Sequence, residues 1–238
     1  MAKTTTAQMT VAAHNVRQMS ARGIDVVFGV PAEPVLPFLE ALRTAGHPRF
    51  IVCRHQGAAA LMASAYAKVT GRPAAVVADS GPGAVQMLNG GFDAFMDRVP
   101  LLVITGEQPQ GRDRAYVPQA VDVDTLFRDA AVFDHTLVDG AHAPRLVTQA
   151  LRQALFRSRP ARIGVPQDAW TDKVRRAHIA EQPSDLGGTV PTDERAVQRA
   201  AEMLEEAERP VLYAGLGAGK AVEPLLQLAE KAGAPIVH

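Results

Sequence analysis

The chain has 238 residues, of which 47% are hydrophobic and 21% are charged, so it can bury a sizeable core. Its 25 Lys and Arg residues balance its 25 Asp and Glu residues, which leaves no net field to favour nucleic acid or a membrane surface as a partner. The apolar runs are far shorter than the ~20 residues of a membrane span, and the N-terminus lacks an apolar signal core, so we expect a cytoplasmic protein.

Six short apolar runs alternate with segments of helical length and predict the strands of one sheet. They cover residues 25–29, 50–53, 74–79, 101–105, 135–138 and 162–165. Alternation of this kind is typical of a parallel sheet with helices on both faces. The runs are continuously apolar, as expected when both faces are covered. We therefore expect an α/β fold with a doubly wound, mostly parallel six-stranded sheet.

The segments between these strands carry helix signals. Helices are predicted over residues 10–22, 34–45, 57–69, 86–94 and 144–156. Gly46 and Gly71 follow two of them directly, at the position where a left-handed residue commonly ends a helix. The helix over 144–156 presents its apolar residues on one stripe, which indicates that one side packs on the sheet.

The composition changes after Pro166. Residues 172–194 are charged and rich in Gly, Pro, Ser and Thr, which predicts a first domain over 1–179 and a linker over 180–191. In the remaining residues, 192–238, Asp193 can cap a helix to 204, and a strand over 210–214, a glycine loop, a helix over 222–232 and a strand from 235 follow. Two strands and two helices cannot close a core, so we expect the beginning of an incomplete second α/β domain.

A glycine-proline turn, Asp79-Ser80-Gly81-Pro82-Gly83, follows the third predicted strand and opens a helix. Ligands of open α/β sheets collect at the carboxyl ends of strands, where glycines let the backbone come close. The turn lacks the Lys and Ser or Thr of a phosphate loop. By itself it is explained equally well as a tight turn without a ligand.

Other classes of site find little support. The single cysteine, Cys53, excludes an internal disulfide framework and lies in an apolar run typical of a buried thiol. The seven histidines show no zinc-ligand spacing, so we assign no metal ligand. The loop over 215–219 lacks the glycine spacing and the later acidic residue of a dinucleotide fingerprint.

Five separated segments together resemble the pyrimidine-binding domain of thiamine-diphosphate-dependent enzymes of the acetolactate synthase and pyruvate oxidase type. These are VFGVP at 27–31, RHQ at 54–56, SGPGA at 80–84, DRVPLLVITG at 97–106 and the segment from 119 to 127. Their order and spacing agree with that family. The resemblance covers about residues 7–170, and residues 208–238 resemble the opening of the family's central domain.

The resemblance implies that thiamine diphosphate is held at a dimer interface, with its pyrimidine on this domain and its diphosphate and magnesium on another. Gln56 stands where the family normally has a glutamate that exchanges a proton with the pyrimidine ring. Pro31, Pro82 and Gln86 match positions near that ring. Gln119 matches a position on the loop that faces the reacting carbon.

Gln56 is the departure that matters most. An amide can donate a hydrogen bond to the ring nitrogen, but it has no titratable proton, and loss of a positioned acid or base costs ~10²- to 10⁴-fold in rate. A branch of the family with an apolar residue at this position still catalyses carboligation, so the amide is compatible with slow or adapted turnover. The alternative left open is that Gln56 is only a polar residue at a helix start.

The function that the resemblance implies is decarboxylation of a small, pyruvate-like 2-oxo acid, followed by carboligation or oxidation. The family's diphosphate signature, Gly-Asp-Gly followed by an asparagine, is absent from this sequence. We therefore expect this chain to be inactive alone and to need a diphosphate-binding domain from another chain or segment, in a homo- or hetero-oligomer. Whether a flavin binds stays open. The alternative is a noncatalytic paralogue or fragment that serves as a binding or assembly module.

Overall fold

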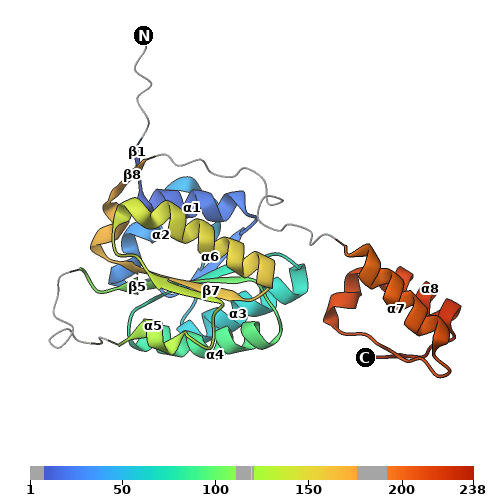
Figure 1. Ribbon diagram of the computed structural model, residues 1–238. Coiled ribbons are helices and arrows are strands. Elements are labelled where there is room, and N and C mark those ends of the chain that lie inside the picture. The colour runs from blue at the N-terminus through green and yellow to red at the C-terminus, as the bar shows by residue number, and fades with distance from the viewer. Residues whose placement is uncertain (1–7, 111–118, 120, 176–191) are drawn as a thin grey trace, which may run out of the picture. The chain divides into compact units, whose positions relative to one another are not determined.

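The computed structural model describes residues 8–110, 119, 121–175 and 192–238 (Figure 1). The chain divides into two compact units, Met1–Gly188 and Thr189–His238. The predicted linker over 180–191 lies outside the described residues, so the domain bounds of 1–179 and 192–238 stay a prediction. Within the described ranges, no helix is both long and apolar enough to cross a membrane.

The first unit contains one six-stranded sheet. Its strands are β2 (Val26–Gly29), β3 (Arg49–Val52), β4 (Ala74–Asp79), β5 (Leu101–Glu107), β6 (Phe133–Thr136) and β7 (Pro160–Pro166). They lie in the order β3-β2-β4-β5-β7-β6, and every pair of neighbours is parallel. The predicted doubly wound α/β fold is confirmed, and the sheet is wholly parallel.

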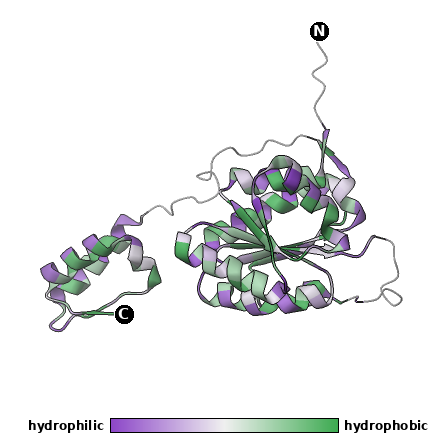
Figure 2. Cartoon of the chain, turned by 180° about the vertical axis from the view of Figure 1, so that it is seen from behind, coloured by the Kyte–Doolittle hydropathy of each residue, from purple (hydrophilic) through white to green (hydrophobic). Residues whose placement is uncertain are grey.

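Helices cover both faces of this sheet. On one face lie α1 (Val11–Ala21), α2 (Leu36–Ala45) and α6 (Ala143–Arg157), and on the other α3 (Gln56–Thr70), α4 (Pro82–Met96) and α5 (Val123–Leu126) (Figure 1). Each helical layer encloses its own apolar cluster against the strands, and Figure 2 shows the hydrophobic strands running between the layers. Burial of both faces explains why the central strands β4 and β5 are largely apolar.

The helix boundaries follow the local signals in the sequence. Thr10 caps α1 by accepting a hydrogen bond from the amide of Ala13 (3.1 Å), and a capping side chain of this kind stabilises a helix by about 1 kcal/mol. Gly46 and Gly71 end α2 and α3 with φ of 70° and 67°, the left-handed conformation that glycine adopts without strain. One predicted strand is displaced, because β6 begins at Phe133, two residues before the predicted 135.

A two-stranded antiparallel ribbon, which the sequence did not predict, joins the two ends of the first unit. In it β1 (Gln8–Thr10) pairs with β8 (Lys173–Arg175), and the amide of Val11 donates to the carbonyl of Asp172 (3.0 Å). Three-residue strands are too short to show a period of two in the sequence.

Helices α3 and α4 approach each other closely at Gly90. A Cβ at this position would lie 2.5 Å from both the carbonyl carbon and the Cβ of Ala60, and backbone cannot move aside cheaply. We expect Gly90→Ala to lower the free energy of unfolding by about 1–3 kcal/mol, measured by urea denaturation. In the matched control Gly91→Ala, the added methyl group meets Phe127 at 3.7 Å, an ordinary contact, so a comparable loss there would contradict the explanation.

The second unit follows the predicted order of elements. It contains α7 (Glu194–Glu206), β9 (Leu212–Tyr213), a 3₁₀ turn (Leu216–Lys220), α8 (Val222–Ala232) and β10 (Ile236–Val237), with β9 and β10 parallel. Asp193 caps α7 by accepting from the amides of Arg195 (3.0 Å) and Ala196 (3.3 Å). Of its described residues only Ala234 is buried.

Candidate functional site

A cavity of about 580 Å³ lies at the carboxyl ends of β2, β4, β5 and β7. Its walls come from residues 32–34, 37, 79–80, 108–109, 119 and 167–168. This is the edge at which open parallel sheets bind ligands, and the volume is in the range of small-molecule sites. The geometry therefore makes this edge the candidate site.

Gln56 is the first residue of α3 and lies beside this cavity. His55 caps the helix, because its Nδ1 accepts from the amide of Gly57 (3.0 Å). The side chain of Gln56 is half-buried, and its Nε2 donates to Oδ1 of Asp79 (3.3 Å). Asp79 is the last residue of β4 and lines the cavity. The amide thus faces a wall of the site, not bulk solvent.

The turn between β4 and α4 needs its glycines because other groups come very close. Gly81 has φ of 67°, and a Cβ there would lie 2.1 Å from the carbonyl oxygen of Gln119. A Cβ at Gly83 would lie 1.8 Å from Oδ1 of Asp79. Pro82 between them is the first residue of α4, where a missing N–H costs nothing. The turn is therefore shaped by the residues packed on it.

The other predicted site residues lie around the same edge at different distances from the cavity. Gln119 lines it, and its φ of 66° is left-handed. Pro31 is exposed and directly precedes the lining residue Ala32. Gln86 is exposed on α4, one turn beyond Pro82, and does not line the cavity. Of the five positions, Gln119 lines the cavity and Gln56 contacts the lining residue Asp79, and the roles of all five stay predictions.

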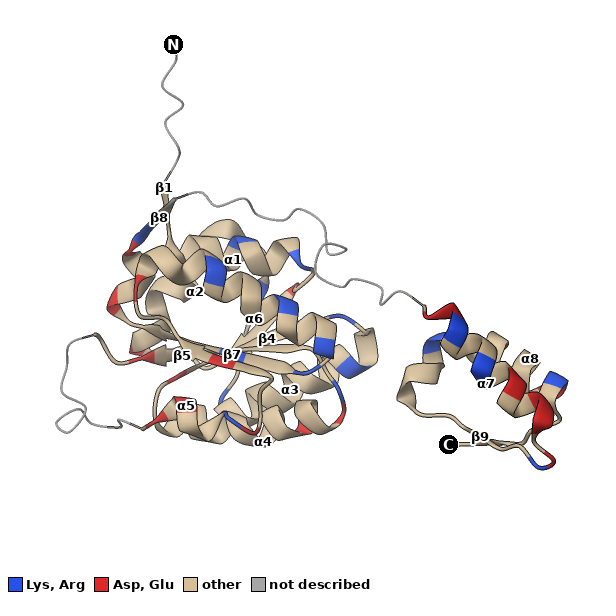
Figure 3. Ribbon diagram, in the orientation of Figure 1, with Lys and Arg blue, Asp and Glu red and all other residues tan. Residues whose placement is uncertain are grey.

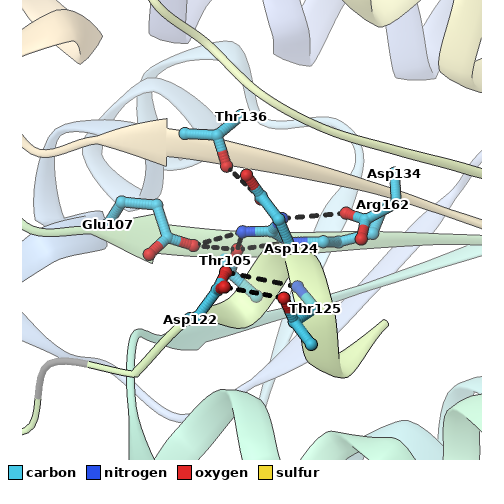
Figure 4. A network of polar contacts seen from close by, with 8 residues as sticks. All are labelled: Thr105, Glu107, Asp122, Asp124, Thr125, Asp134, Thr136 and Arg162. Atoms are coloured by element: carbon cyan, nitrogen blue, oxygen red, sulfur yellow. Dashed lines mark hydrogen bonds and ion pairs between the residues drawn. The ribbon is translucent and has the colours of Figure 1, made fainter. Parts of the chain in front are cut away.

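A buried ion network that the sequence did not predict lies next to the cavity wall. Figure 4 draws its members, Thr105, Glu107, Asp122, Asp124, Thr125, Asp134, Thr136 and Arg162. Arg162, in β7, has no exposed surface. Its guanidinium pairs with Glu107, Asp124 and Asp134, the last at 2.8 Å. Figure 3 shows Lys and Arg (blue) and Asp and Glu (red) interspersed over the helices and the connecting segments.

Burial and pairing shift the pKa values of the carboxyl groups in this network in opposite directions. Burial raises the pKa of Glu107 although the charge of Arg162 lowers it, and burial likewise raises the pKa of Asp134. Burial also acts to raise the pKa of Asp124, but hydrogen bonds from Thr136 and Arg162 bring it below its usual value. The network ties α5, which begins four residues after Gln119, to the sheet.

The site offers room and polar groups that fit the pyrimidine half of thiamine diphosphate. The cavity of about 580 Å³ provides the room, and the amide of Gln56 provides a hydrogen-bond donor beside it. Among the described residues, no cluster of three or more His, Cys, Asp and Glu side chains is arranged to hold a metal ion.

Two family models match the chain. The N-terminal TPP-binding domain of thiamine pyrophosphate enzymes matches residues 9–126, and the central domain of thiamine pyrophosphate enzymes matches residues 197–238. The first match contains the whole turn at Gly81 and both Gln56 and Gln119. Together the two models account for well over half of the chain.

Curated relatives agree with these models. The chain is 34% identical over 216 residues to the "Putative thiamine pyrophosphate-containing protein YdaP" of Bacillus subtilis, covering 90% of this chain and 38% of that protein. It is 32% identical to the acetolactate synthase of Mycobacterium bovis, covering 97% of this chain and 38% of that protein. It is 30% identical to the pyruvate oxidase of Lactiplantibacillus plantarum (93% and 37%). The chain thus spans less than two fifths of the length of these relatives, and it belongs to the thiamine pyrophosphate enzyme family, with the N-terminal cofactor-binding domain and residues of the central domain.

Proposed function

We propose that this chain supplies the pyrimidine half of a thiamine diphosphate site in an enzyme that acts on a small, pyruvate-like 2-oxo acid by decarboxylation and carboligation or oxidation. The observation that carries the proposal is the position of Gln56, at the start of α3 and within hydrogen-bond distance of a cavity wall. Relatives named acetolactate synthase and pyruvate oxidase support the reaction class.

Thiamine diphosphate, when bound, supplies the carbon nucleophile that attacks the carbonyl group of the 2-oxo acid. The residues of this chain would bind and orient its ring. Gln56 donates a hydrogen bond to the ring nitrogen, while Pro31, Pro82 and Gln86 form the surroundings of the ring. Gln119 on the cavity wall faces the substrate. Because Gln56 has no proton to exchange, we expect slow proton transfer at this step.

The proposed assembly includes a further copy or a further segment of protein, which carries the diphosphate and magnesium. Large apolar side chains support such an assembly, because they remain exposed on α3 and α4. Examples are Met62 (44% exposed), Phe92 (43%) and Met96 (72%). Exposed apolar groups gathered on two adjacent helices are typical of protein interfaces.

Titration with thiamine diphosphate and magnesium, followed by calorimetry, tests the proposal on the assembled protein. We expect binding by the wild type and a loss of at least about tenfold in affinity for Gly81→Ala, because the added methyl group would displace Gln119 from the turn. Gly219→Ala is the matched control, since nothing lies within 4 Å of its added Cβ. Absence of binding by the wild type would overturn the proposal.

A noncatalytic assembly module is the second candidate function, favoured by the amide at position 56 in place of an acid. The two candidates differ in turnover. Release of carbon dioxide from pyruvate by the assembled protein excludes the module, whereas tight binding of thiamine diphosphate without turnover supports it.

A further inference from the structure

The contact between Gln56 and Asp79 determines which end of the Gln56 amide faces which way. An ionised carboxylate only accepts hydrogen bonds, so the amide nitrogen must be the group that faces Asp79, at 3.3 Å. Its carbonyl oxygen then points elsewhere. An amide without such a neighbour has no fixed choice between the two orientations.

The orientation decides what Gln56 can offer to a ligand. An amide nitrogen carries two hydrogens, and one of them is used on Asp79 in the described structure. The second is available for an acceptor such as the ring nitrogen of a pyrimidine. With the amide turned over, its oxygen would meet the lone pair of that nitrogen, and the contact would be repulsive.

Two features keep the carboxylate of Asp79 in place. Gly83 leaves the necessary room, because a Cβ there would lie 1.8 Å from Oδ1 of Asp79 and 3.3 Å from Nε2 of Gln56. The carboxylate of Asp79 also lies beside the first turn of α4. This helix has 15 residues, and the N-terminal end of a helix favours a negative charge. Asp79 is half-buried and lines the cavity as well.

We propose that Asp79 is a positioning residue that holds the Gln56 amide as a hydrogen-bond donor toward the pyrimidine of thiamine diphosphate. In this arrangement the negative charge that relatives would carry at position 56 stands at position 79, one hydrogen bond away. The inference rests on the proposed function. It assigns a role to a residue that sequence reasoning treated only as part of a turn.

The pair has a consequence for the substitution Gln56→Glu. That change places two carboxylates within hydrogen-bond distance of each other, and like charges at this distance raise the pKa of one of them and act against each other. The single variant is therefore a poor imitation of a normal family site. Only Gln56→Glu combined with Asp79→Asn restores one acid and one amide, with their positions exchanged.

Four proteins test the inference, namely the wild type, Asp79→Asn, Gln56→Glu and the double variant. The affinity of each assembled protein for thiamine diphosphate with magnesium is measured by calorimetry. For Asp79→Asn we expect about tenfold weaker binding. For Gln56→Glu we also expect weaker binding than for the wild type, since two carboxylates then face each other. The double variant should return to within about threefold of the wild type.

The outcomes separate this inference from the proposed function. If the wild type binds and Asp79→Asn binds equally well, or if the double variant is as weak as Asp79→Asn, the positioning role is overturned while the site remains. A purely structural role of Asp79 predicts no rescue by the exchange. If the wild type does not bind at all, the proposed function and the inference fall together.

A second measurement needs no cofactor and uses the 238-residue chain itself. In amide NMR spectra, the side-chain N–H signals of Gln56 are identified by their loss in Gln56→Glu. We expect them to shift in Asp79→Asn, because the partner of the Nε2 hydrogen bond changes from a carboxylate to an amide. The exposed amide of Gln86 is the internal control. Signals of Gln56 that keep their positions in Asp79→Asn would overturn the inference.

Discussion

Replacing Arg162 with methionine lowers the free energy of unfolding by about 3–5 kcal/mol, the largest loss that we expect from any single change. Methionine keeps much of the volume of the side chain but removes the positive charge that Glu107 and Asp134 share. Both carboxylates are largely buried, with side chains 15% and 10% exposed. They would remain in the interior without their partner, and an uncompensated buried charge is costly.

Urea unfolding at pH 7 measures this loss, with Arg152→Met as the control. Arg152 is exposed on α6, so its replacement should change stability by no more than about 0.5 kcal/mol. The loss in free energy of unfolding caused by Arg162→Met should be smaller at pH 5 than at pH 7, because unpaired buried carboxylates take up protons more readily at the lower pH. A loss below about 1 kcal/mol at pH 7 would show that the network contributes little.

The second large effect is a loss of stability in mild acid that comes from His14. This histidine has no exposed surface, and neither ring nitrogen has a hydrogen-bond partner among the described residues. Burial, with a smaller contribution from Arg22 and then Arg17, lowers its pKa from 6.5 to about 4. Between these two values the unfolded chain binds the proton and the folded chain does not. Stability is therefore fully present above pH 6.5 and is lost as the pH falls toward 4, by about 2 kcal/mol at pH 5.

Comparison of the wild type with His14→Leu isolates this contribution, since all other titrating groups are common to both proteins. We measure the free energy of unfolding of both proteins in urea at pH 7 and pH 5. The decrease from pH 7 to pH 5 should be smaller for His14→Leu than for the wild type, by about 2 kcal/mol. At pH 7 we expect His14→Leu to be neutral or stabilising, because it removes two unpaired polar atoms from the interior. Equal pH dependence of the two proteins would contradict this assignment.

Most of the fold could be predicted because its signals are local. Apolar runs of four to six residues indicated the strands, and the strand over 74–79 has the predicted bounds in β4. Glycines at 46 and 71 and the capping residue Asp193 marked helix ends. These signals act within a few residues of chain, so one sequence is enough to detect them.

The displaced strand and the ion network share one physical cause. The predicted strand begins at 135, which leaves the charged residue Asp134 just outside it. In the structure Asp134 lies within β6 and pairs with Arg162 on the neighbouring strand β7. The sequence signal that could have indicated the network is Arg162, which stands at the start of an apolar run expected to be buried on both faces. Such a charge needs partners, but their identity depends on strand order.

Part of the candidate site could likewise be predicted from the sequence, and part could not. The motif resemblance relates Gln56, Pro82 and Gln119 to one site, and in the structure the turn that contains Pro82 lies close to both glutamines. It could not indicate that Asp79 would face Gln56, since the two are 23 positions apart. Their contact depends on how the end of β4 and the start of α3 are set side by side, which is a property of the packed sheet.

The ribbon of β1 and β8 brings two distant parts of the first unit side by side. Gln8 pairs with Arg175 across it, so the first and last described strands of this unit are neighbours. A folded body whose two ends meet can be inserted into, or exchanged between, larger proteins without stretching either junction. Through this pairing the first unit is joined to its flanking segments at one corner.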